Sequence, residues 1–75
     1  MTFAERVAVE VASARQKHEP IHSLHEGYAV ILEELDEFKA EVWKKREYRD
    51  RVETLKELIQ VSAMAQRVAE DCHLL

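Results

Sequence analysis

The stretch GYAVILEELDEFKAEVWKK, residues 27–45, decides the fold, because it combines a helical apolar seam with a stripe of carboxylates. Apolar residues recur along it and just before it at spacings of three and four, the period of a helix with one buried face. The seam consists of Leu24, Tyr28, Ile31, Leu35, Phe38 and Val42. Three basic residues at 44–46 favour a helix end there. The pattern predicts a helix over residues 24–47.

Two further helices flank this one. A side-chain acceptor followed three residues later by glutamate is typical of a helix start. This signature occurs at Thr2, Ser23 and Asp50. Together with the apolar periodicity it predicts helices over about residues 3–18, with the end at Lys17 or His18, and about residues 51–73. Pro20 prevents the first of them from continuing.

No strand pattern occurs in the chain, so the expected fold is all-α in one helical domain, residues 1–75. Helices joined by a short connection pack as antiparallel neighbours, which makes the second and third helices a hairpin with the first packed across it. A chain of 75 residues buries only a small core, so we expect a partner subunit to supply additional stabilisation. The small residues Ser62, Ala63, Ala65 and Ala69 permit another helix to approach. We therefore expect a homodimer, or a higher oligomer, that completes a four-helix-type bundle.

Composition narrows the class of protein. The formal net charge of -4 argues against a protein that binds a nucleic-acid polymer. The single cysteine, Cys72, forms no internal disulfide, and no apolar run approaches the roughly 20 residues of a membrane span. The N-terminus lacks the basic segment followed by an apolar segment that is typical of a signal peptide. A cytoplasmic protein without a membrane partner is expected.

The carboxylates of the second helix form a stripe at the edge of its apolar seam. Glu34, Glu37 and Glu41 lie within about 60° of one another on a helical wheel. Antiparallel packing is expected to set Glu57 and Gln60 of the third helix opposite Glu34 and Glu37. Clustered carboxylate oxygens beside an amide oxygen suit a hard cation such as Mg²⁺ or Mn²⁺. The alternative is a solvated flank, since charges on helices usually face water.

A nucleotide base would need a pocket near such a site. Gly27 and Val30 continue the Glu34 stripe and are expected to leave space there. Tyr28 and Trp43 are candidates to stack on a base, with ordinary packing as the alternative interpretation for each.

The acidic residues also resemble a known family. The Glu-Glu-x-x-Glu of Glu33, Glu34 and Glu37, followed by a helical motif beginning at Glu57, is similar to that of the MazG-like all-α nucleoside triphosphate pyrophosphohydrolases. The stretches HSLHEGYAVILEELDEFKAEVWK and LKELIQVSAMAQRVAED resemble small phage-type and bacterial members. The resemblance covers roughly residues 16–72.

This resemblance implies an activity and a set of site residues. It implies that Mg²⁺ binds Glu34, Glu37 and Glu57 and holds a nucleoside triphosphate, NTP or dNTP, while water attacks the α-phosphorus to release a monophosphate and pyrophosphate. Glu33 would be a supporting acid or a base that positions the water. Gln60 stands where the family has aspartate, so this ligand would be a neutral carbonyl and the site would carry one charge fewer.

A rival hypothesis comes from another class of protein. The chain would then be a non-catalytic helical module for dimerisation or protein interaction, with a degenerate metal site and exposed glutamates. Gln60 favours this alternative. The position of the carboxylates at the margin of apolar faces favours the enzyme, because burying them without a cation is costly.

Overall fold

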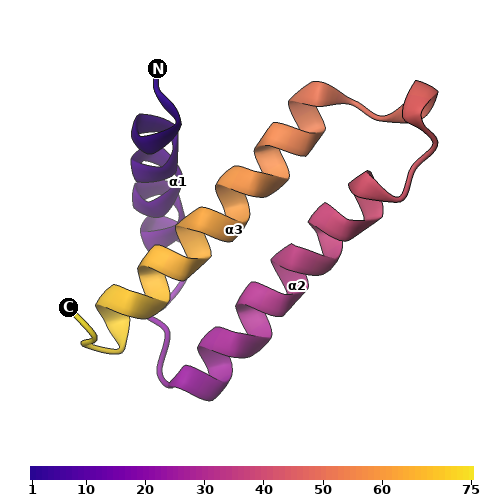
Figure 1. Cartoon of the computed structure of the whole chain (residues 1–75). Coiled ribbons are helices and arrows are strands. Elements are labelled where there is room, and N and C mark those ends of the chain that lie inside the picture. Colours follow the sequence, from indigo (N-terminus) through magenta and orange to yellow (C-terminus); the bar gives the residue numbers. More distant parts are fainter.

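The computed structural model describes all 75 residues and is built from helices. In chain order they are α1 (Phe3–Lys17), α2 (Leu24–Val42), the short 3-10 helix η1 (Arg46–Tyr48) and α3 (Arg51–Asp71). α2 and α3 form an antiparallel hairpin, and α1 packs against α3 (Figure 1). α1 and α2 make no contact with each other, so α3 is the central element. The expected all-α class is confirmed.

Side-chain caps begin all three α-helices at the residues where the sequence predicts them. At α1 the Oγ1 of Thr2 accepts a hydrogen bond from the Glu5 amide at 3.1 Å, and the Glu5 carboxylate accepts one from the Thr2 amide at 2.9 Å. Ser23 caps α2 and Asp50 caps α3, each by accepting from amides of the first turn. These caps satisfy donors that have no partner within the helix.

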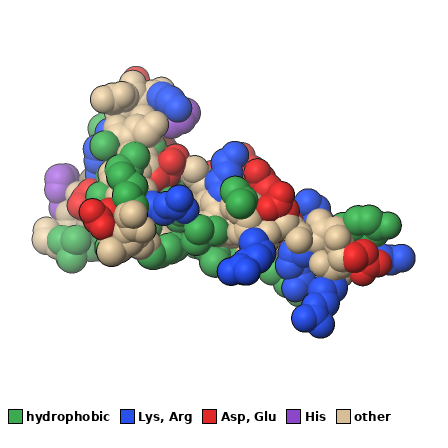
Figure 2. All heavy atoms as spheres, turned by 90° about the horizontal axis from the view of Figure 1, so that it is seen from above, with side chains coloured by type: hydrophobic (Ala, Val, Ile, Leu, Met, Phe, Trp, Pro, Cys, Tyr) green, Lys and Arg blue, Asp and Glu red, His purple; other side chains and the backbone are tan.

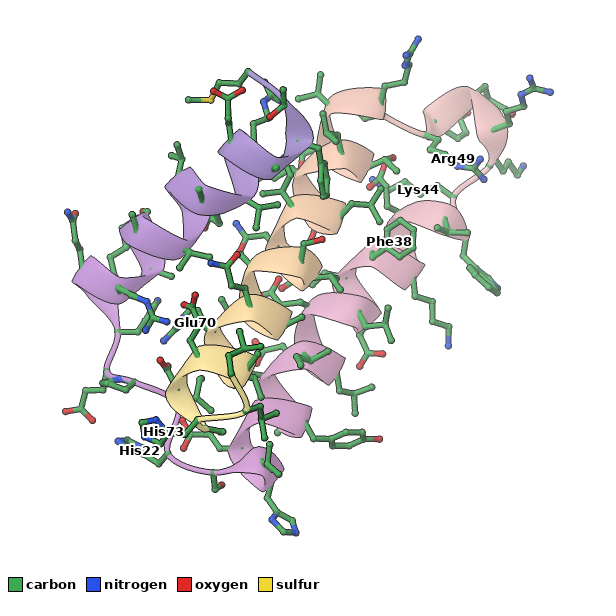
Figure 3. The ribbon with its side chains drawn as sticks, turned by 60° about the vertical axis from the view of Figure 1, so that its left-hand side comes forward. His22, Phe38, Lys44, Arg49, Glu70 and His73 are labelled. Atoms are coloured by element: carbon green, nitrogen blue, oxygen red, sulfur yellow. The ribbon has the colours of Figure 1, made fainter.

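The predicted helix over residues 24–47 is wrong at its end, because α2 stops at Val42. Beyond that residue the Arg49 guanidinium donates to the Val42 carbonyl at 2.7 Å. The Glu41 carboxylate turns inward and accepts from the Asp50 amide at 3.0 Å. Residues of the connecting turn therefore bind the last turn of α2, and the turn of the hairpin carries η1 and the side chain of Arg49 (Figure 3).

The other two helices end close to where the sequence predicts. α1 stops at Lys17, one of the two ends expected for it, and α3 stops at Asp71, two residues before the expected end near His73. His73 has a φ of 57°, in the left-handed region that a right-handed helix excludes. The chain therefore turns away from the axis of α3 at this point.

The interface between α1 and α3 holds the apolar core. Val7, Val11 and Ala63 form one buried cluster, with Ile59 packed against it. Ala63 is 0% exposed, so the close approach that its small side chain permits is made by α1 and not by a second subunit. This contact fixes α1 along one side of α3.

An ion-pair clamp closes the far end of the same interface. The Arg15 guanidinium donates to both Glu70 and Asp71 at 2.7 Å, and Glu70 lies between α1 and α3 in Figure 3. The second oxygen of Asp71 accepts from the Ile21 amide at 2.8 Å. The clamp thus fastens both α1 and the segment after it to the end of α3.

Gly27 lets α2 approach α3 closely. A Cβ atom built at this position would lie 2.7 Å from Cγ2 and 2.8 Å from Cγ1 of Val68, which is below any ordinary contact distance. The prediction that Gly27 leaves space for a ligand is therefore wrong, because Val68 fills that space. Val30, on the same side of α2, does line a pocket.

One face of the hairpin remains uncovered by the rest of the chain. Only 10 of the 75 residues are buried, and no large side chain is fully buried. Several apolar residues stay exposed at helical spacing on α2 and α3. We call them the hairpin face: Leu24, Tyr28, Leu35, Leu55 and Leu58. Hydrophobic side chains also reach the surface along the lower edge of the molecule in Figure 2. None of the helices combines the length and apolar composition needed to cross a membrane.

Candidate metal centre

Three carboxylates meet at the middle of the hairpin. Glu34 and Glu37, one turn apart on α2, lie opposite Glu57 of α3, and one oxygen from each falls within 4.8 Å of the others. The spacing of three places the first two on one side of α2, and the antiparallel arrangement brings the third to the same height. The structure thus brings together three of the four residues expected as metal ligands.

Burial and the charges of neighbouring carboxylates oppose the ionisation of Glu34 and Glu57. The pKa of Glu34 is raised to about 7, first by burial, then by hydrogen bonding with Glu37 and by the charges of Glu37, Glu57 and Glu33. Burial also raises the pKa of Glu57, with the charge of Glu37 next in importance. No basic residue offsets either shift substantially, since Lys56 acts only weakly on Glu57. A cation or a proton would relieve this repulsion.

One oxygen of Glu57 is left without a partner. Its Oε2 atom is wholly buried and accepts no hydrogen bond. Burying an unpaired carboxylate oxygen costs free energy, so such groups in native proteins are usually hydrogen-bonded or bound to a metal. The orphaned oxygen therefore adds to the unbalanced charge of the cluster.

Glu33 and Gln60 line a pocket together with Glu34, whereas Glu37 and Glu57 lie outside its lining. Glu33 is exposed, and its charge contributes to the raised pKa of Glu34. Gln60 is half-buried one turn after Glu57. Both are placed to act on a molecule held in the pocket.

Glu41, the last member of the predicted stripe, does not join the cluster. Its side chain is 7% exposed and pairs with the Lys44 ammonium at 2.8 Å. Hydrogen bonds from Lys44 and from the Asp50 amide lower the pKa of Glu41. This carboxylate is satisfied by the protein itself and serves the turn of the hairpin.

The pocket has a volume of about 640 Å³, within the usual range of small-molecule sites. It lies between the end of α1, the segment that follows it, and the facing sides of α2 and α3. Lys17, His18, His22 and Arg67 contribute basic or ionisable nitrogen to its lining, and Ile21, Val30 and Met64 contribute apolar surface. Tyr28 and Trp43, the predicted base-stacking residues, are 69% and 74% exposed and do not line it.

Arg67 is the pocket residue that the sequence analysis missed. Its side chain is buried on α3, with an exposed fraction of only 2%. The sequence did carry a signal, because Arg67 follows Ala63 and Met64 and precedes Val68 on the otherwise buried part of α3. An arginine at such a position needs partners for its charge.

The arrangement offers a hard divalent cation carboxylate oxygens from two helices, with a pocket beside them for further oxygen ligands. Mg²⁺ binds proteins through few carboxylates and fills its remaining positions with water and phosphate oxygens, so this donor set suits it. A comparison of the chain with protein-family models, with curated proteins and with solved structures found no match in any of the three.

Proposed function

We propose that the chain is a MazG-like, metal-dependent nucleoside triphosphate pyrophosphohydrolase, which cleaves NTP or dNTP to the monophosphate and pyrophosphate. Mg²⁺, or Mn²⁺ in its place, would be held by Glu34, Glu37 and Glu57. The observation that carries this proposal is the convergence of these three carboxylates within 4.8 Å, at a point where one of them, Glu34, lines a pocket of about 640 Å³. The orphaned Glu57 oxygen supports it further.

The remaining residues have roles that follow from their positions. A bound metal would neutralise charge on the phosphates as water displaces pyrophosphate from the α-phosphorus. Glu33 accepts the proton of the attacking water, or holds that water in line, because it is exposed beside Glu34. Gln60 offers a neutral carbonyl oxygen, so it tunes the site without adding to the repulsion among the carboxylates.

We propose also that two copies of the chain pair through the hairpin face. Its five exposed apolar residues lie on the hairpin, and only α3 is covered by α1. Burying them against the same face of a second copy would build a four-helix bundle and enlarge a core that is small for an independent domain. The double substitution Leu35→Glu/Leu58→Glu would then convert a dimer into a monomer in sedimentation experiments, whereas Val9→Glu, an exposed site on α1, would leave the dimer intact.

A second candidate function is favoured by the same face. In that case the chain is a helical interaction module, the hairpin face is its working surface, and the carboxylates form a degenerate site. The two functions differ in one measurable property, since only the enzyme requires a divalent cation at Glu34 and Glu37.

Calorimetric titration of Mg²⁺ and Mn²⁺ into the purified protein separates the two. The parent protein, a Glu34→Gln/Glu37→Gln variant and a Glu47→Gln control would each be titrated with and without a non-hydrolysable nucleoside triphosphate. Glu47 lies in η1 and carries an exposed carboxylate outside the cluster. The enzyme predicts binding that only the double variant loses, followed by metal-dependent release of pyrophosphate from a panel of NTPs and dNTPs. Absence of metal binding by the parent would reject the enzyme and leave the interaction module.

A further inference from the structure

Arg67 carries a buried positive charge that the protein does not neutralise by contact. None of the five ion pairs of the chain involves it. Its guanidinium donates to the Glu19 carbonyl at 3.0 Å and lies 3.8 Å from the Met64 sulfur, a weak acceptor. Its Nε is buried with no partner at all. A guanidinium has five N–H donors, so most of its hydrogen-bonding capacity is unused.

Asp71, a carboxylate whose pKa responds to this charge, is already occupied. Arg67 contributes to the lowered pKa of Asp71, but only after the Ile21 amide and Arg15. One oxygen of Asp71 binds Arg15 and the other binds the Ile21 amide. Asp71 is therefore not a free counter-ion for Arg67, and a buried charge without one is costly.

The pocket consequently has two unbalanced ends. Glu34 lines it together with Arg67, yet the charges acting on Glu34 are all negative, so Arg67 does not offset the carboxylate cluster. Gln60 and Arg67 are two helical turns apart on α3, which separates their backbones by about 10 Å. Glu34, which meets Glu37 and Glu57 outside the lining, thus stands at one end of the pocket, and Arg67, without an ion-pair partner, stands toward the other. Glu10, Glu19 and Glu26 also line the pocket, and the carboxylates of Glu19 and Glu26 lie 3.8 and 3.2 Å from His22 rather than on Arg67.

We propose that Arg67 binds the phosphate chain of the ligand, at the end of the pocket away from Glu34. A polyphosphate with a divalent cation matches both ends, because the cation meets the carboxylates and the free phosphate oxygens meet the guanidinium. Arginine suits this role, since its planar fork of donors pairs with two phosphate oxygens at once. The inference rests on the proposed function for the metal end, whereas anion binding at Arg67 can be measured separately.

The phosphate chain could come from a nucleotide or from an inorganic polyphosphate, and the probes distinguish the two. Tripolyphosphate and a non-hydrolysable nucleoside triphosphate would be titrated into the parent protein, first with Mn²⁺ and then in EDTA. Mn²⁺ alone would be titrated as well, because its affinity reports on the carboxylates only. A tighter complex with the nucleotide than with tripolyphosphate would assign the apolar part of the pocket lining to the nucleoside.

Three variants isolate the guanidinium. Arg67→Met keeps most of the side-chain volume and removes the charge, Arg67→Lys keeps the charge, and Arg6→Met makes the same chemical change at an exposed site outside the pocket. Arg67→Met is expected to weaken tripolyphosphate binding at least tenfold and to leave the affinity for Mn²⁺ within twofold. Arg67→Lys should recover part of the loss, and Arg6→Met should behave as the parent.

Each other result has a definite meaning. Unchanged phosphate binding by folded Arg67→Met overturns the inference and assigns Arg67 to holding the Glu19 carbonyl, without touching the proposed function. Failure of the parent to bind Mn²⁺ rejects the proposed function, and the titrations in EDTA then decide the inference alone. If Arg67→Met does not fold, amide chemical shifts of the parent protein decide it: tripolyphosphate must shift residues around Arg67 and Glu19, and their constancy overturns the proposal.

Discussion

The ends of the α2–α3 interface differ sharply from its middle. At one end Gly27 admits Val68 to direct contact, and at the other the Glu41 carboxylate is held by Lys44 and the Asp50 amide. In the middle, the carboxylates of Glu34, Glu37 and Glu57 face one another, and the charges that act on Glu34 are those of other carboxylates. Glu41 and Glu34 come from the same stripe of α2, yet their pKa values move in opposite directions. The ends hold the helices together, so the middle can carry a destabilising arrangement that a ligand would relieve.

The largest expected effect comes from removing the charge of Glu34, in the middle of the α2–α3 interface. Glu34→Gln should lower metal-dependent pyrophosphate release about 100-fold, the upper range for disturbing a metal site. The same change should raise the Tm of the metal-free protein at pH 8, because it removes a repelled charge. Pyrophosphate release and thermal unfolding of one preparation would measure both. A variant that loses activity and stability together would show that Glu34 is a structural residue like Glu41.

The next effect comes from crowding the close-packed end. Gly27→Ala should destabilise the protein by about 1–2 kcal/mol, because overpacking costs roughly 1–3 kcal/mol and the better helix propensity of alanine returns up to about 1 kcal/mol. Urea denaturation would measure the free energy of unfolding. The double variant Gly27→Ala/Val68→Ala should be more stable than the sum of the single effects predicts, since the added methyl then has room. Strict additivity would mean that the two helices are not in contact here.

The free energy of unfolding should change with pH by about 1–2 kcal/mol because of the carboxylates in the middle of the α2–α3 interface alone, after allowance for screening by solvent. A carboxyl whose pKa is raised on folding binds its proton more tightly in the folded state, so stability is lost as pH rises from about 4.5 through about 7. Carboxylates with lowered pKa values, among them Glu41 and Asp71, act in the opposite sense only below this window.

Urea denaturation of the metal-free protein between pH 5 and pH 8 tests this, with Glu34→Gln as the matched control. Saturating Mg²⁺ should remove the slope, because metal binding requires the ionised carboxylates. A flat profile for the metal-free parent would contradict the view that the middle of the interface is strained.

The smallest effect is expected at the turn. Glu41→Gln keeps an acceptor for the Asp50 amide and loses only the ion pair with Lys44, so it should lower the Tm slightly and leave Mg²⁺ affinity within twofold. Thermal unfolding and calorimetry would measure these two quantities. A large loss of metal affinity would show that Glu41 belongs to the metal site and does not differ from Glu34 in this respect.

Local signals in the sequence predicted the helix starts and the meeting of the carboxylates. Caps at Thr2, Ser23 and Asp50 depend on neighbouring residues only, and the position of Glu57 follows from counting along two antiparallel helices. The features that the sequence could not predict depend on contacts between separate segments of the chain. α2 ends at Val42, where Arg49 and Asp50 from the turn bind its last residues.

The sequence also did not predict which side chains fill or line the space between the helices. The space beside Gly27 belongs to Val68, 41 positions away by residue number, and no local pattern announces such a contact. The isolation of Arg67 depends on Asp71 being taken by Arg15, a partner 56 residues distant. Such features appear only when the chain is folded.

The attachment of α1 to α3 alone has a consequence for how the chain folds. The hairpin joins segments separated by a short turn, whereas the contacts of α1 with α3 close a loop that contains all of α2, and its clamp joins residues 55 and 56 positions apart. Closing a longer loop costs more chain entropy, and long-range contacts slow folding. We expect the hairpin to form first and α1 to dock last, so amide protons of α1 should exchange with solvent ahead of those in the centre of α3.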